Sequence, residues 1–273
     1  MVDPTKAGAS EKAVFSTFET IESWRQTIRN AFVPQQHSEL WADDQDWPHF
    51  PTSTVAWVGL ASTVDHLDAI KRHLQARVLF SFAHLTLCRS ALIGAAQAVW
   101  ILGPPDSHTR IKRSRTVTAD MYRKHLKYIE GLQEQAETPH IGTDTVATTL
   151  TELVHDLGEK RNADGQRSDL DTTKMIEEAA DLAFGQPKLT REAILCWRSS
   201  SGAAHGFFWQ FFGTVGTAQT KLAGDDGLAE FQTGGSLERM SNGYLAAYQI
   251  ARQGWALLNQ RGSNAPRNQA GGG

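Results

Sequence analysis

An arginine and a histidine lie seven residues apart in one largely apolar stretch, and their types suit acid–base chemistry on a phosphate. They are Arg198 and His205, with the small residues Ser201 and Gly202 between them. A guanidinium can hold a phosphate through two parallel hydrogen bonds, and an imidazole gains or loses a proton near neutral pH. The small residues would leave a shallow floor between the two longer side chains. We therefore take Arg198 and His205 as candidate catalytic residues, and Ser201 and Gly202 as candidate substrate-binding residues.

A structural interpretation of the same residues is also open. An arginine and a histidine on one helix often form a hydrogen-bonded pair, so suitable residue types are only a statistical pointer to function. Ser201 and Gly202 could equally admit another helix at close range. The sequence by itself does not choose between a site and a packing contact.

Arg89 is a further candidate for substrate binding, because it interrupts an apolar run that extends from Leu79 to Ala96. Burying a guanidinium without a partner costs several kcal/mol, so it must reach solvent, an acidic side chain or a phosphate. A structural salt bridge and a place in the site are both open for Arg89.

The segment 108–128 is the strongest basic cluster in the chain. It holds seven basic residues against the single acid Asp120: Arg110, Lys112, Arg113, Arg115, Arg123, Lys124 and Lys127. Such a cluster could attract a phosphate of RNA or a nucleotide toward the candidate site, with Arg110 and Arg113 as binding residues. It could equally be a solvated helix face that balances the acidic segments after it.

Hydrophobic periodicity predicts that helices position these residues. The segment 189–212 reads as one long buried helix, since one stripe at helical spacing carries Ile194, Trp197, Ser201, Ala204, Phe208 and Phe211. The same periodicity predicts helices over 11–32, 108–128, 143–163, 171–184 and 236–259. Residues 53–102 form either one very long helix or two consecutive helices with a break near 75–78. The expected fold is all-α, a single bundle of about six or seven helices over residues 11–260.

Two irregular segments interrupt this pattern. Residues 33–52 form an aromatic and proline-rich loop, and we expect Trp41, Trp47 and Phe50 to cover the helices. Residues 213–235 are glycine-rich and indicate a flexible loop or a short hairpin that turns at Asp226 and Gly227. Residues 1–10 and 261–273 are expected to be disordered.

Composition excludes several classes of protein. The net charge of −3 over 273 residues argues against a protein that coats nucleic acid nonspecifically. Cys88 and Cys196 lie in apolar helical runs, so neither a disulfide framework nor a structural zinc site is expected. We expect no metal and no cofactor. The N-terminus lacks the order of a secretory signal, and we find no apolar run of about twenty residues, so a cytoplasmic protein without membrane contact is expected.

Three pieces of the chain resemble a group of uncharacterised bacterial helical proteins. They are AHLTLCRSALIGAAQAVWIL at 83–102, HTRIKRSR at 108–115 and WRSSSGAAHG at 197–206. The last piece is also similar to the signature of HEPN-domain proteins, an arginine followed at short spacing by a histidine, here Arg198 and His205. The residue after the arginine is Ser199, where HEPN ribonucleases often have Asn, Asp or His.

The resemblance implies a HEPN-like helical bundle and a metal-independent endoribonuclease of a bacterial toxin or phage-defence type, or a protein that only binds RNA or a nucleotide. It also implies that the Arg and His of two protomers meet in a homodimer. The aromatic run 207–212 independently favours a homodimer. At helical spacing its side chains spread over a wider arc around the helix axis than one buried stripe occupies. The alternative is a noncatalytic scaffold or regulatory protein that uses the same groove for a protein partner.

Overall fold

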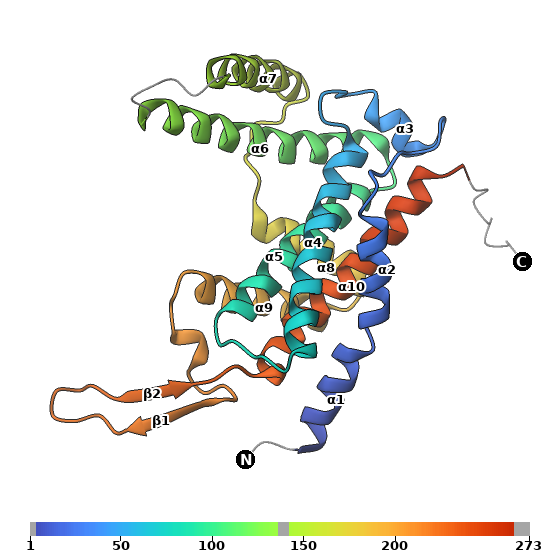
Figure 1. Ribbon diagram of the computed structural model, residues 1–273. Coiled ribbons are helices and arrows are strands. Elements are labelled where there is room, and N and C mark those ends of the chain that lie inside the picture. Colours follow the sequence, from blue (N-terminus) through green and yellow to red (C-terminus); the bar gives the residue numbers. More distant parts are fainter. Residues whose placement is uncertain (1–3, 136–141, 265–273) are drawn as a thin grey trace, which may run out of the picture.

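The computed structural model describes residues 4–135 and 142–264, and these residues confirm an all-α fold (Figure 1). The helices are α1 (Pro4–Phe15), α2 (Phe18–Thr27), α3 (Glu39–Asp44), α4 (Thr52–Gln75), α5 (Ala83–Leu102), α6 (Ser107–Gln135), α7 (Thr143–Ala163), α8 (Thr172–Phe184), α9 (Pro187–Ala204) and α10 (Leu237–Gly262). A short 3-10 helix, η1 (Trp209–Phe211), follows α9. The described strands are β1 (Thr217–Lys221) and β2 (Glu230–Thr233), which pair antiparallel.

The centre of the bundle is α5 rather than the segment 189–212. Helix α5 packs against α4, α10, α9 and α8, and twelve of its residues are buried. By length and composition it could cross a membrane, contrary to our expectation that no such run exists. Most of it is buried under the surrounding helices, however, as in the core helix of a soluble protein.

Two glycines bring α4 and α5 into backbone contact. Gly59 and Gly94, the two glycines between positions 53 and 102, face each other across the helix pair. A Cβ atom added to Gly59 would lie 2.6 Å from the carbonyl oxygen of Gly94. Thr63 closes the same contact, because its hydroxyl donates to the carbonyl of Ala91 at 3.0 Å. Of the two alternatives for 53–102, the structure has two helices, and the break between them extends over 76–82, further than the expected 75–78, with Arg77 at a positive φ of 59° inside it.

Helices α6 and α7 form an arm beside the main bundle, and in Figure 1 they lie antiparallel across one end of it. A second apolar cluster holds them together, with Ala119, Tyr122, Ile129, Leu150 and Leu157 buried in it. Phe50 packs against both this cluster and the main core, which connects the arm to the bundle. The predicted aromatic cover over 33–52 is therefore confirmed for Trp47 and Phe50, whereas Trp41 lies on α3 and its ring contacts His37.

Both ends of the chain differ from the expectation. Residues 4–10 belong to α1 instead of being disordered, and the helix predicted over 11–32 is broken between α1 and α2. At this break, Thr17 is buried and its hydroxyl bonds to the carbonyl of Val14 and to the hydroxyl of Tyr244. At the other end α10 runs to Gly262, and Arg261 is buried rather than part of a disordered tail. The rest of that predicted tail, 265–273, lies outside the described residues.

The glycine-rich segment contains a hairpin, the second of the two alternatives. Thr217 pairs with Thr233 at its base, and the register shifts between Gln219 and Lys221. The hairpin projects from the bundle in Figure 1, and nearly all of its residues are exposed. An isolated two-stranded hairpin is marginally stable in water, so the contacts at its base matter.

Candidate functional site

Helix α9 ends at Ala204, not at residue 212 as predicted. Gly206 adopts a φ of +71°, its N–H donates to the carbonyl of Ala203, and the N–H of Phe207 donates to the carbonyl of Gly202. These two bonds form a Schellman motif, which stops a helix at a glycine in the left-handed conformation. The signal was present in the sequence as the glycine directly after His205. The aromatic residues that follow therefore leave the buried stripe and fold back as η1.

The expected shallow floor of the site is filled by this return of the chain. Gly202 is buried, and a Cβ atom added to it would lie 2.7 Å from the ring of Trp209 and 3.2 Å from Oε1 of Gln210. The space above Gly202 is therefore occupied by η1. This corrects the expectation that Gly202 binds substrate. Ser201 is half-buried beside it.

Arg198 and His205 are both exposed, and neither side chain makes a hydrogen bond or ion pair within residues 4–135 and 142–264. The structural pair that the sequence left open is therefore not formed. His205 caps the end of α9, with its ring 5.8 Å from that of Phe207. Seven helical positions separate the two residues by about 10 Å along the axis, on the same side of α9.

Exposed aromatic rings surround the end of α9. We call them the aromatic face: Phe207, Phe208, Trp209, Phe212 and Phe231. Phe208 is 64% exposed, and its ring contacts that of Phe212, which in turn contacts Phe231 from β2. Sequence reasoning missed Phe231, because only the hairpin brings it beside the helix end.

Arg89 lies half-buried on α5, one of the helices that pack against α9. Its Nε atom is buried without a hydrogen-bond partner, and no carboxylate within residues 4–135 and 142–264 pairs with it. The structural salt bridge is therefore not formed among these residues. A guanidinium in this state favours an anion close by.

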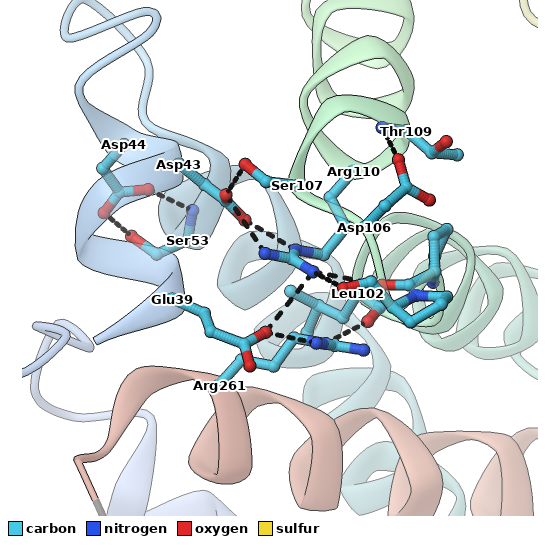
Figure 2. Close-up of polar contacts among 12 residues, drawn as sticks. Glu39, Asp43, Asp44, Ser53, Leu102, Asp106, Ser107, Thr109, Arg110 and Arg261 are labelled. Carbon is cyan, nitrogen blue, oxygen red and sulfur yellow. Dashed lines mark hydrogen bonds and ion pairs between the residues drawn. The ribbon is translucent and has the colours of Figure 1, made fainter.

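Arg110 does not belong to the candidate site. Figure 2 shows it inside a network that joins α3, the start of α6 and the end of α10. Its side chain is 2% exposed and its Nε lies 2.6 Å from Oδ2 of Asp43, which is fully buried. Glu39 pairs with both Arg110 and Arg261, and Arg261 also donates to the carbonyl of Leu102 at 2.6 Å. The network is saturated, so Arg110 is a structural residue and not a binding residue.

Arg113 is likewise held inside the fold. It lies 2.6 Å from Glu178 of α8, donates to the carbonyl of Trp100 at 2.8 Å and covers the ring of that tryptophan. The neighbouring Arg115 pairs with Asp46 and Asp164. Arg110, Arg113 and Arg115 therefore fasten the α6–α7 arm to the bundle, and the predicted attraction of phosphate by Arg110 and Arg113 loses its basis.

A cavity of about 610 Å³ lies on the other side of η1, between α9 and α10. Glu192, Ser199 and Asn242 are among its lining residues. Gln210 also borders it, but its amide atoms are shielded from solvent and have no hydrogen-bond partner. The cavity is lined by two carboxylates, from Glu192 and Glu238, and by Arg239, whose guanidinium donates to the Thr233 hydroxyl and the Gly234 carbonyl.

Within residues 4–135 and 142–264, no group of three His, Cys, Asp or Glu side chains is arranged to hold a metal ion. Comparisons of the chain with protein-family models, with curated proteins and with solved structures found no match. The HEPN resemblance therefore stands on Arg198 and His205 alone.

Proposed function

We propose that the end of α9 and the aromatic face bind single-stranded RNA, and that Arg198 and His205 cleave it without a metal ion. The observation that carries the proposal is the exposure of both side chains on α9, where they have no hydrogen bond or ion pair among the described residues, together with the exposed rings that follow the helix, of which Phe207 lies next to His205. Proteins that bind single strands combine basic groups for the backbone with aromatic rings on which bases stack.

The chemistry needs a base and a stabilising cation. His205 takes the proton from a ribose 2′-hydroxyl, the 2′ oxygen attacks the adjacent phosphorus, and the bond from phosphorus to the 5′ oxygen breaks. The products are a 2′,3′-cyclic phosphate and a 5′-hydroxyl, which takes its proton from water. Arg198 stabilises the charge on the phosphate oxygens in the transition state. DNA lacks the 2′-hydroxyl and is not cut.

The test is incubation of a single-stranded RNA with the protein in EDTA. We expect cleavage by the wild type, and its loss in Arg198→Ala and His205→Ala at an unchanged melting temperature, because neither side chain has a partner in the fold. The matched controls are Arg252→Ala on α10 and His155→Ala on α7, which remove exposed residues of the same types elsewhere. Cleavage that survives in His205→Ala contradicts the catalytic assignment.

Binding is measured separately with a DNA strand of the same sequence, which cannot be cut. Phe208→Ala should weaken binding about 5- to 150-fold, which corresponds to losing the stacking free energy of one base. Undiminished binding by this variant, or no binding by the wild type, removes the RNA-binding proposal. Binding without cleavage keeps the surface and excludes the reaction.

A second candidate function is that of a noncatalytic scaffold whose aromatic face packs on a protein, with a second copy of this chain as the first partner to test. The contiguity of Phe208, Phe212 and Phe231 favours it, because large exposed apolar patches commonly mark interfaces. The two candidates differ in what covers these rings, nucleobases or another protein.

A further inference from the structure

Two histidines close the loop between α4 and α5 through a chain of hydrogen bonds. The backbone N–H of Phe80 donates to Nδ1 of His84 at 3.2 Å, and Nε2 of His84 lies 3.2 Å from Nδ1 of His73. His84 is 1% exposed, whereas His73 is half-buried. The ring of Phe80 packs against both imidazoles.

The hydrogen bonds determine where the protons lie. Nδ1 of His84 accepts a backbone N–H, so the proton of neutral His84 is on Nε2. That proton points at Nδ1 of His73, which must accept it, so the proton of neutral His73 is on its own Nε2. Any further proton on either ring must take a nitrogen that already accepts a hydrogen bond. The chain of bonds is therefore complete only when both histidines are neutral.

The surroundings of His84 disfavour its charged form. Burial lowers its pKa to about 4, and the positive charge of His73 acts in the same direction. Among the residues with described side chains, His73 is the titratable group whose charge affects His84, and no carboxylate from α4, α5 or the hairpin offsets it.

The loop that these histidines hold also supports the hairpin. The hydroxyl of Ser81 donates to the carbonyl of Thr233 at 3.3 Å, at the end of β2. Gly235, two residues further, approaches Leu79 so closely that an added Cβ atom would lie 2.5 Å from its carbonyl carbon. Because Thr233 pairs with Thr217, the loop contacts the hairpin at its base.

We propose that His73 and His84 form an acid-sensitive latch, which in mildly acidic solution releases the loop between α4 and α5 and loosens the base of the hairpin. One added proton breaks either the bond between the imidazoles or the bond from Phe80. The released loop no longer holds Ser81 against Thr233. Since β2 carries Phe231, the latch also controls the position of one ring of the aromatic face. The latch does not depend on RNA binding.

The direction of the pH effect follows from the two states of His84. Its pKa is about 4 in the closed loop and near the ordinary 6.5 in an open loop. The stabilisation from the closed latch is therefore fully present above pH 6.5 and is lost as the pH falls toward 4. Between pH 7.5 and pH 5 this difference raises the opening constant of the loop about 30-fold.

Hydrogen exchange of the full chain at pH 7.5 and pH 5, corrected for intrinsic rates, measures this opening. We expect residues 76–82 and 230–235 to lose about 30-fold in protection at pH 5, while α5 stays protected. In the double variant His73→Asn/His84→Asn, neither residue titrates and each retains an acceptor oxygen near the position of Nδ1, so this loss should disappear. The control His66→Asn replaces a half-buried histidine of α4 whose Nδ1 contacts the carbonyl of Ser62, and this variant should behave as the wild type.

Unchanged protection of the wild type at pH 5 would overturn the latch. A loss of protection that persists in the double variant would do the same, because another group would then be responsible. Imidazole nitrogen NMR of the wild type gives a test without substitution: at pH 7.5 both rings should carry their proton on Nε2, and a proton on Nδ1 of His84 contradicts the proposal.

Discussion

At the residue scale, two arginines that look alike in the sequence have opposite surroundings. Arg110 is paired with Asp43 in the network of Figure 2, whereas Arg198 is exposed and has no ion pair with the residues that the structure describes. Removing one member of a buried ion pair leaves the other charge without compensation, which costs about 3–5 kcal/mol. The loss of an exposed side chain usually changes stability by less than about 0.5 kcal/mol.

Arg110→Met should therefore lower the free energy of unfolding by about 3–5 kcal/mol, because Asp43 stays buried without its cation. Arg198→Met, the matched control, should leave it nearly unchanged. Urea unfolding followed by circular dichroism measures both. Equal stabilities of the two variants would show that the network contributes little.

At the element scale, the contact between α4 and α5 depends on the absence of two side chains. A methyl group at Gly94 would meet the backbone of Gly59 and the hydroxyl of Thr63, neither of which can move without separating the helices. Gly158 of α7 has nothing within 4 Å of an added Cβ atom. The same substitution thus has opposite expected effects at two helical positions.

Gly94→Ala should lower the free energy of unfolding by about 1–3 kcal/mol through overpacking. Gly158→Ala should raise it by about 0.5–1 kcal/mol, because alanine favours a helix more than glycine does. Thermal or urea unfolding decides the sign for each variant. A stabilised Gly94→Ala variant would mean that the two helices separate easily.

At the scale of the whole molecule, the hairpin and the aromatic face expose several large apolar side chains within the described residues. The interior of the main bundle is closed around α5, and the α6–α7 arm has its own apolar cluster. The hairpin, in contrast, projects with Leu222, Leu228 and Phe231 exposed. A second copy packed on this region would remove these side chains from water.

We expect a dimer by light scattering at micromolar concentration, and we expect Phe208→Ser with Phe212→Ser to shift it to a monomer with its helical spectrum intact. A control pair, Leu182→Ser with Leu195→Ser, changes exposed leucines of α8 and α9 and should leave the dimer unchanged. A wild-type monomer would leave the aromatic face to another partner, such as a nucleic acid.

Local signals in the sequence predicted the helical class and the bounds of α7 and α8 to within one residue, but not the bounds of α1, α2 or α3 or the end of α6. Apolar periodicity places α5, α7, α8 and α10, and Asp106 caps the start of α6 by accepting from the N–H of Thr109. The end of α9 at Ala204 was also readable, from the glycine two positions later. The predicted end at residue 212 was wrong because the apolar periodicity continues through the aromatic residues after Gly206.

Only the tertiary structure decided which polar residues are structural. Arg110 meets Asp43 from 67 positions away, and His73 meets His84 across a break between helices. Arg198 and His205, in contrast, meet no partner in the described part of the chain. Residue type and helical spacing cannot distinguish a candidate site from a salt bridge, because neither depends on which side chains the other elements place nearby. A charged side chain becomes structural when a distant element supplies its counter-charge, and that depends on how the helices pack.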